Sequence, residues 1–232
     1  MTGLWAVSDL STQVGYVKAC DKVQCLAYQL SFLYIMDTQN QKHIQAVLDL
    51  ATAGDVAQGL SWYSTALNAA KELASRYNIY IATACAVIAA LSPRNKWERN
   101  LIDAENMINA FTTVGECKDV KVCTFGKNKA KAVEILMNDG NHSNVFEDIL
   151  SGPKLREFYR CIMGLKDVCI DGHAYSIWFG DRVTLANVPS IGKKLRKQIK
   201  DDYLAVADAN GFSGYELQAI TWCAHRRLHG VA

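Results

Sequence analysis

The stretch Ile79–Leu91, which reads IYIATACAVIAAL, decides the fold class of this 232-residue chain. Drawn as a helix it is apolar on nearly every side, and a helix without a polar face belongs in the interior of a protein. It ends at Ser92-Pro93, where the serine can cap the next helix and the proline can occupy its first position. The whole chain contains only three prolines, and long stretches without helix breakers favour helices. The sequence therefore predicts an all-α protein.

Helical periodicity continues on both sides of this segment, with apolar residues three or four positions apart. The chain has no internal repeat, low-complexity segment or proline-rich linker, so we expect packed lobes rather than separable domains. Residues 1–90 should pack with residues 205–232 as one lobe, and residues 91–204 should form the central lobe. The other expected helices, with a break at Gly54-Asp55, cover residues 16–33, 42–51, 62–77, 95–110, 151–163, 175–179, 191–209 and 213–228. Residues 124–136 should be a short loop that opens onto a helix, and residues 145–150 a short helix or a turn.

The composition excludes several classes of protein. Half of the residues are apolar and 21% are charged, which excludes a disordered or collagen-like chain. The longest apolar run, Ala82–Leu91, is too short to span a bilayer, and residues 1–10 lack the pattern of a secretory signal. We therefore expect a cytoplasmic protein with no membrane partner. No two of the eight cysteines form a CxxC pair, so we expect no zinc or iron–sulfur site and no metal.

Three polar residues in the second half of the chain could carry chemistry. Lys154 opens a helix after Gly152-Pro153, Asp171 follows a short apolar run, and His173 comes two residues later. Taken singly, each has an ordinary structural explanation, since a lysine at a helix start is usually solvated and such an aspartate usually caps a helix. Their order and spacing, together with other motifs, favour a functional interpretation.

The motifs, read in order over about residues 82–230, resemble the helix–hairpin–helix DNA glycosylases of the endonuclease III superfamily. The resemblance implies a two-lobed, helical glycosylase-like fold that binds DNA, with Lys154 and Asp171 as catalytic residues in the cleft between the lobes. It also places Arg94 where the family has a residue that wedges into the duplex. The motifs are Leu91-Ser-Pro-Arg94, Phe125-Gly-Lys-Asn-Lys-Ala130, Gly152-Pro-Lys154, Ile170-Asp-Gly-His173 and Gln218-Ala-Ile-Thr-Trp222.

The hairpin segment departs from the family pattern. Leu150-Ser-Gly-Pro-Lys154 lacks one glycine of the family hairpin and is shorter. In three of its motifs the chain resembles a divergent bacteriophage group. In sequence order these motifs are Ala-Leu-Ser-Pro-x-x-x-Trp-x-x-Asn, Gly-Pro-Lys-x-Arg-x-Phe-Tyr and Ile-Asp-x-His. That group is related to the glutamyl/putrescinyl-thymine pyrophosphorylases, also called amino acid:DNA transferases. This resemblance implies location in a bacterial or phage-infected cell, and for a transferase an amino acid or amine co-substrate; we expect no other cofactor.

The chemistry of these residues agrees with both resemblances. A neutral lysine amine can attack the sugar C1′ as a base leaves, and an aspartate can stabilise the positive charge that develops there. Either reaction requires the base to leave the duplex stack and enter a pocket. We expect that pocket to be formed by Ser92, Trp97, Tyr159, His173, Tyr175 and Trp222, although most of the aromatic residues could simply pack in the core.

Clusters of basic residues favour DNA as the partner, because lysines at helix N-termini bind phosphate well. We expect DNA contacts from Arg94, Lys127, Lys129, Lys131, Arg156, Lys193, Lys194, Arg196 and Lys197. Three functions stay open on the sequence alone: a glycosylase with an additional lyase activity, a thymine-hypermodifying transferase, and a DNA-binding protein without catalysis. The base that is recognised and the oligomeric state also stay open.

Overall fold

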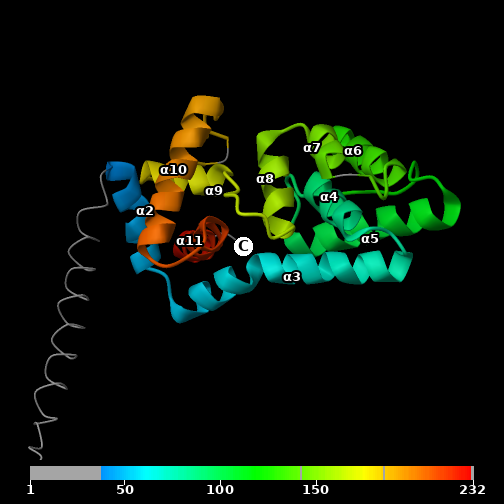
Figure 1. Ribbon diagram of the computed structural model, residues 1–232. Coiled ribbons are helices and arrows are strands. Elements are labelled where there is room, and N and C mark those ends of the chain that lie inside the picture. Colours follow the sequence, from blue (N-terminus) through cyan, green and yellow to red (C-terminus); the bar gives the residue numbers. More distant parts are fainter. Residues whose placement is uncertain (1–37, 142, 185, 231–232) are drawn as a thin grey trace, which may run out of the picture.

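The computed structural model describes residues 38–141, 143–184 and 186–230, and within these ranges the chain forms ten helices and no strand (Figure 1). The prediction of an all-α protein is confirmed, while the helix expected over residues 16–33 lies outside the described residues. The helices are α2 (Gln39–Asp49), α3 (Ala53–Tyr77), α4 (Ile81–Leu91), α5 (Trp97–Val114), α6 (Gly126–Met137), α7 (Ser143–Leu150), α8 (Pro153–Ile162), α9 (Gly172–Phe179), α10 (Lys193–Ala209) and α11 (Gly214–Leu228).

Helix α3 begins much earlier than its apolar spacing predicts. The expected break at Gly54-Asp55 is wrong, because Thr52 and Asp55 form a capping box there. The Thr52 hydroxyl accepts a hydrogen bond from the Asp55 backbone N–H at 3.2 Å, and the Asp55 carboxylate accepts one from the Thr52 N–H at 2.8 Å. These two bonds satisfy amide donors that the first turn would otherwise leave unpaired, so the glycine falls inside the helix.

The helices form two groups, each with its own apolar core. The larger group consists of α3 to α8 around α4, in which every residue from Thr83 to Leu91 is buried. The smaller group consists of α2, α9, α10 and α11, packed around side chains such as Ile199 and Tyr203. In Figure 1, α3 runs along the bottom of the molecule and lies under both groups.

This grouping differs from the predicted lobes. Helix α4, expected with the N-terminal helices and the C-terminal one, packs against α3 and also among α5 to α8, because an all-apolar helix needs apolar neighbours on every side. Helices α9 and α10, expected in the central lobe, pack with α2 and α11 instead. The chain passes from the smaller group to the larger between α2 and α3, and returns between α8 and α9.

A glycine allows the close packing of α3 against α11. A Cβ atom on Gly59 would lie 2.5 Å from the Cα atom of Ile220, closer than real Cβ contacts come. The two backbones therefore touch at this point, and Tyr63, one turn further along α3, lies directly beside α11. This contact positions the residues described in the next section.

None of the described helices is by itself long and apolar enough to cross a membrane. Helices α3 and α4 reach the required length and composition only as a pair, and that pair is bent by 119°.

Candidate active site at the boundary of the two helix groups

Lys154 and Asp171, seventeen residues apart in the sequence, meet where the two groups of helices face each other. The extended segment after α8 runs beside the first turn of that helix, and the Cys169 thiol lies 3.8 Å from the Lys154 carbonyl oxygen. Two residues later the same segment ends at Asp171, the N-cap of α9. The fold thus brings the predicted lysine and aspartate to one side of this boundary.

Asp171 caps a helix and still has a carboxylate oxygen available. Its Oδ1 atom accepts a hydrogen bond from the Ala174 backbone N–H at 2.9 Å. The described residues donate no hydrogen bond to Oδ2, and the side chain is half-buried. The carboxylate is therefore held in a fixed orientation by the cap and retains one oxygen for another partner.

Lys154 occupies the second position of α8, after Pro153. The side chain is exposed, and among the described residues its ammonium has no hydrogen-bond or ion-pair partner. A lysine in this state is free to bind an anion or a substrate that approaches the boundary.

His173 lies between these two residues and α11. Its Nδ1 atom is 3.4 Å from Nδ1 of His225, and its ring is edge-on to Trp222 with 6.3 Å between centroids. Burial lowers the pKa of His173; the carboxylate of Asp171 opposes that change, and Arg226 and Lys154 add to it. Because Asp171 and Lys154 act on the same imidazole, they share one local environment.

Helix α11 presents a polar and aromatic stripe to this centre. Gln218, Trp222, His225 and His229 follow each other at helical spacing, so they lie on one face. Burial, together with the neighbouring His229 and His173, lowers the pKa of His225 to about 4. At neutral pH this imidazole is uncharged and can act as both a hydrogen-bond donor and an acceptor.

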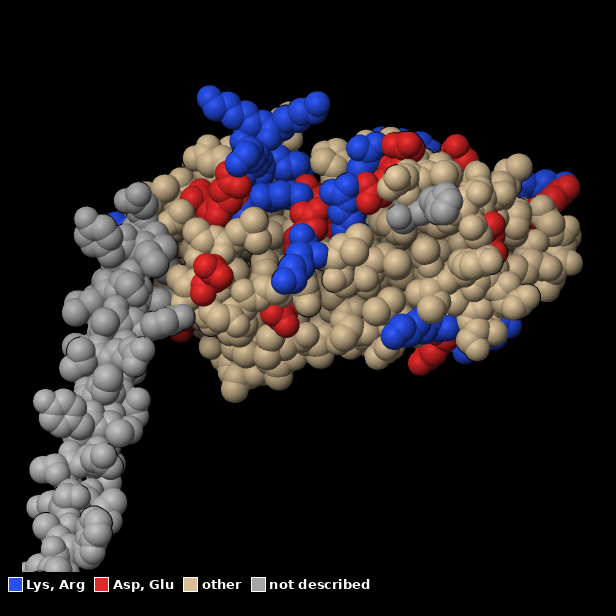
Figure 2. Space-filling view, viewed as in Figure 1, with Lys and Arg blue, Asp and Glu red and all other residues tan. Residues whose placement is uncertain are grey.

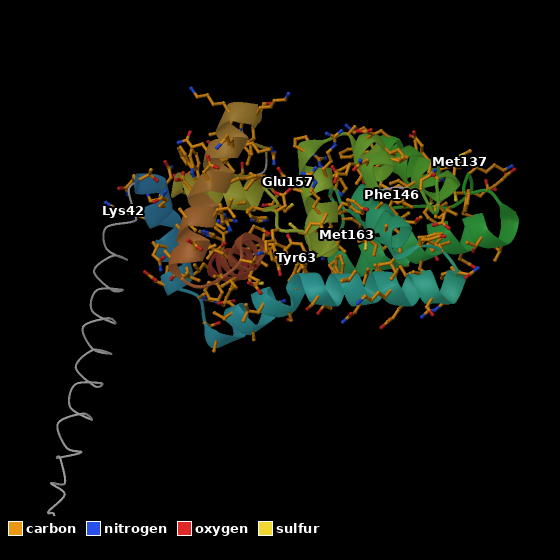
Figure 3. The ribbon with its side chains drawn as sticks, viewed as in Figure 1. Lys42, Tyr63, Met137, Phe146, Glu157 and Met163 are labelled. Carbon is orange, nitrogen blue, oxygen red and sulfur yellow. The ribbon has the colours of Figure 1, made fainter. Side chains whose placement is uncertain are left out.

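Tyr63 of α3 completes the centre from below. Its hydroxyl donates a hydrogen bond to Gln218 Oε1 at 2.8 Å, and both residues are buried. Figure 3 shows Tyr63 between the two groups of helices, beside α11 and below α8. The centre is therefore built by α3, α8, α9 and α11 together.

Of the residues predicted to bind a base, Trp222 and His173 lie at this centre. Trp222 is half-buried, its ring centroid is 4.8 Å from that of Trp62, and the Arg226 guanidinium lies over it at 4.4 Å. The Trp97 ring centroid lies 5.6 Å from that of Trp62, and Trp97 packs against the larger core. The three tryptophans thus join α5, α3 and α11.

The other three predicted pocket residues have structural roles elsewhere. Tyr159 is fully buried in the larger core against Phe146, because the helix face that carries it packs inward. Tyr175 is buried in the smaller core and stacks on Phe179. Ser92 ends α4, and its hydroxyl donates to the Ala89 carbonyl at 2.9 Å.

Four of the predicted DNA-binding residues lie near one another, on α6, on α8 and in the turn after α4. Arg94 and Lys127 both lie over the Phe125 ring, at 5.2 and 5.9 Å from its centroid. Burial lowers the pKa of Lys131, and the nearby charges of Lys127 and Arg156 lower it further. We call Arg94, Lys127, Lys131 and Arg156 the basic ridge. Figure 2 shows lysines and arginines along the upper edge of the molecule, over α6 to α8 and at the start of α10, with aspartates and glutamates between them.

The remaining predicted contacts are of two kinds. Lys193 and Lys194 are exposed at the start of α10, as a phosphate contact would require. Arg196 instead points inward and donates to Glu157 at 2.6 Å and to the Ile170 carbonyl at 3.1 Å, which removes it from the surface. The internal partners of Lys197 and Lys129 are the Asp201 carboxylate and the Lys118 carbonyl oxygen.

Two hollows in the surface lie away from Lys154 and Asp171. The larger, of about 810 Å³, opens between the end of α5 and α6 beside Phe111, Val133 and Met137. The smaller, of about 290 Å³, lies between Arg94 and Phe125. In the described part of the chain, no group of three or more His, Cys, Asp or Glu side chains could hold a metal ion.

A family model described as a family of unknown function, DUF7178, matches residues 33–229. The chain belongs to this family. No curated protein and no solved structure matches it. The match spans every described helix of the DUF7178 chain, from α2 to α11, and hence every residue of the centre.

Sequence reasoning did not assign Tyr63, Gln218, His225 or Arg226 to the site. The signal for α11 was available, because buried polar residues interrupt its apolar face at Gln218 and His225. Tyr63 carries no such signal, since it joins the site only through the packing of α3 on α11.

Proposed function

We propose that this protein is a DNA-binding enzyme that acts on a base extruded from the duplex, most simply as a DNA glycosylase with a helix–hairpin–helix glycosylase-like fold. The observation that carries the proposal is that the segment ending at Asp171 runs beside the first turn of α8, which carries Lys154, with the Cys169 thiol 3.8 Å from the Lys154 carbonyl oxygen. The basic ridge supports a polyanionic partner.

Asp171 is the proposed catalytic carboxylate. Its Oδ2 atom, which no described residue engages, would stabilise positive charge at C1′ as the glycosidic bond breaks, or orient the water that attacks C1′. The nucleobase leaves with the electron pair of the glycosidic bond. A proton from the attacking water goes to a proton acceptor such as the Asp171 carboxylate. The cap from Ala174 would keep the carboxylate in place during this step.

Lys154 is the proposed anchor and, in a lyase reaction, the nucleophile. As an exposed ammonium it would bind a phosphate that flanks the target nucleotide. After loss of a proton, its amine could attack C1′ as the base leaves with the electron pair of the glycosidic bond; transfer of an amine proton to the ring oxygen then opens the sugar and leaves a Schiff base at C1′. The first role needs only the charge of the side chain, whereas the second needs the amine itself.

The turn between α7 and α8 favours a second candidate, a transferase that modifies a thymine derivative without removing it. Only Ser151 and Gly152 separate the two helices. The Lys131 ammonium donates to the Leu150 carbonyl at 2.5 Å and to the Ser151 hydroxyl at 2.6 Å. The Leu150 carbonyl at this short turn thus accepts a hydrogen bond from an ammonium. The short turn departs from the glycosylase hairpin and agrees with the transferase-like motif.

The test is incubation with duplexes that contain thymine, uracil or 5-hydroxymethyluracil, followed by mass spectrometry of the released bases and the nucleosides. A glycosylase releases free base, and a transferase changes the mass of the nucleoside. Asp171→Asn should lower the rate by orders of magnitude, whereas Asp119→Asn, at an exposed aspartate away from the boundary, should not.

Borohydride reduction separates the roles of Lys154. A covalent adduct that is lost in Lys154→Gln indicates the lyase reaction, and its absence leaves the anchoring role. The proposal is overturned when none of these substrates is altered, or when Asp171→Asn keeps the full rate.

A further inference from the structure

The buried segment that ends at Asp171 needs partners for its backbone outside a sheet. Val168, Cys169 and Ile170 are buried, and the described part of the chain contains no strand that could pair with them. A buried backbone N–H or C=O group without a hydrogen bond costs free energy. Side chains of the neighbouring helices therefore have to bind the backbone here.

Ile170, the residue directly before Asp171, is bound at both of its backbone polar groups. Its N–H donates to Glu157 Oε2 at 3.0 Å, and its carbonyl oxygen accepts from Arg196 Nη1 at 3.1 Å. The same Nη1 atom donates to Glu157 Oε2 at 2.6 Å, so the two side chains also hold each other. Because the Ile170 carbonyl belongs to the planar peptide bond that leads into Asp171, these contacts fix the backbone that carries the Asp171 side chain.

Glu157 lies on the same helix as Lys154, one turn further along α8. Its carboxylate is held at the other oxygen as well, since Oε1 accepts from the Lys200 ammonium at 2.9 Å, and the side chain is only 3% exposed. The hydrogen bond from Ile170 to this helix therefore ties the position of Asp171 to that of Lys154.

The chemistry of the Glu157–Arg196 pair suits orientation better than stability. Replacing a buried ion pair by apolar side chains of similar volume is often neutral or stabilising. Apolar side chains cannot bind an N–H and a C=O group in fixed directions, whereas hydrogen bonds can. The pair supplies this direction at the residue that precedes the proposed catalytic carboxylate.

We propose that Glu157 and Arg196 are positioning residues that hold the Asp171 carboxylate in a fixed place relative to Lys154. This inference rests on the proposed function. Both side chains act through the backbone of Ile170 and do not touch the substrate. Their loss should lower kcat strongly and alter the affinity for DNA little, because a displacement of about 1 Å at a reacting group can cost about a hundredfold in rate.

The main variant combines Glu157→Leu with Arg196→Met. It replaces the buried pair by apolar side chains, so that neither charge of the pair is left without the other. Lys200 keeps a carboxylate partner, because its ammonium also donates to Asp167 Oδ1 at 2.5 Å. The main variant should therefore fold, which separates a loss of rate from a loss of structure.

Two further variants serve as controls. Glu157→Gln keeps an oxygen that can accept from Ile170, so it should keep most of kcat. Met107→Ala opens a cavity in the larger core on α5, outside the Glu157 network, and should lower stability but not the kcat of the folded protein. Urea denaturation gives the stability of each variant, and rates are compared where all of them are folded.

Two measurements are made on each variant. Single-turnover kinetics and fluorescence anisotropy, on duplexes that contain thymine, uracil or 5-hydroxymethyluracil, should show a loss of about a hundredfold in kcat for the main variant, with little change in Kd. Hydrogen exchange of the Ala174 amide reports on the carboxylate without any reaction, because Asp171 Oδ1 accepts from that amide at 2.9 Å. This exchange should become about tenfold faster in the main variant.

The exchange measurement keeps the two proposals distinguishable. Faster exchange at Ala174, with no turnover by the unaltered protein on any of these duplexes, supports the positioning of Asp171 and overturns the proposed catalysis. A folded main variant that keeps kcat, that loses kcat and DNA affinity equally, or that leaves the exchange unchanged overturns the positioning role alone. Should the main variant fail to fold, the same outcomes are read from Arg196→Lys, which keeps the charge beside Glu157 but not the planar fork of donors that reaches Ile170.

Discussion

The interior of the larger helix group and the boundary between the two groups are held together in different ways. Helix α4 is enclosed by apolar side chains, and its packing needs no specific partner. The boundary depends on a buried carboxylate: Glu157 of α8 accepts from Arg196 at 2.6 Å, from Lys200 at 2.9 Å and from the Ile170 backbone N–H at 3.0 Å. Figure 3 shows Glu157 between α8 and the smaller group. Apolar packing can tolerate substitution, whereas a buried charge network requires each of its members.

The largest expected effect comes from breaking the boundary network. Glu157→Ala removes the carboxylate and leaves the Arg196 and Lys200 side chains, both mostly buried, without this partner. We expect a loss of about 3–5 kcal/mol in the free energy of unfolding, measured by urea denaturation. Glu72→Ala, at an exposed position on α3, should change it by less than about 0.5 kcal/mol.

A loss below about 1 kcal/mol in Glu157→Ala would show that the boundary is held by apolar contacts in the same way as the interior. Glu157→Gln sharpens the comparison, because it can still accept from Ile170 and removes only the charge.

A smaller effect is expected from pH, and the histidines of the boundary should contribute to it. The pKa of His225 is about 4 in the folded protein against an ordinary value of 6.5, and that of His173 is lowered in the same direction. Between these pH values the unfolded chain binds more protons than the folded one. The contribution of His225 is therefore complete above pH 6.5 and is lost as the pH falls towards 4, with about 2 kcal/mol of the loss between pH 7.5 and pH 5.

Urea denaturation at pH 7.5 and pH 5 measures this change. In His225→Gln the difference between the two pH values should shrink. An unchanged difference would mean that His225 does not supply the pH dependence.

The smallest effect on stability is expected from the exposed lysines of α10, where the change should appear in DNA binding instead. Replacing Lys193 and Lys194 by Gln should alter the free energy of unfolding by no more than about 0.5 kcal/mol. On the proposed function it should lower the slope of log affinity against log salt by about two, measured by fluorescence anisotropy at several KCl concentrations.

Arg196→Gln is the contrasting variant, because this arginine belongs to the boundary network. It should lower stability strongly and change the salt slope little. Equal behaviour of the two variants would contradict the division between surface cations and boundary cations.

Much of the fold could be predicted because apolar spacing reports burial directly. The run around Val87 and Leu91 gave an all-apolar helix, and the structure encloses it on every side. The start of α3 could not be located in that way, since a capping box, rather than an apolar residue, begins it. The observed groups of helices differ from the predicted lobes for a related reason. Apolar spacing identifies the buried face of a helix but not the helix that covers that face.

The part of the candidate site that could be predicted consists of reactive residues that lie close together in the sequence. Lys154, Asp171 and His173 follow one another within twenty residues, and the segment that joins α8 to α9 brings them together. Basic residues were less predictable, because a charge can face either solvent or a buried partner. Lys193 and Arg196 are three residues apart, yet only the first is exposed.

The sequence by itself determined the helices, the buried position of α4 and the order of Lys154, Asp171 and His173, because these depend on residues that are close along the chain. Only the tertiary structure decided that Tyr63 of α3 binds Gln218 of α11, 155 positions away. It also decided that Glu157 binds Arg196 across the boundary. The physical reason is that hydrogen bonds and ion pairs depend on distance and direction in space, which packing between helices creates and which sequence spacing does not contain.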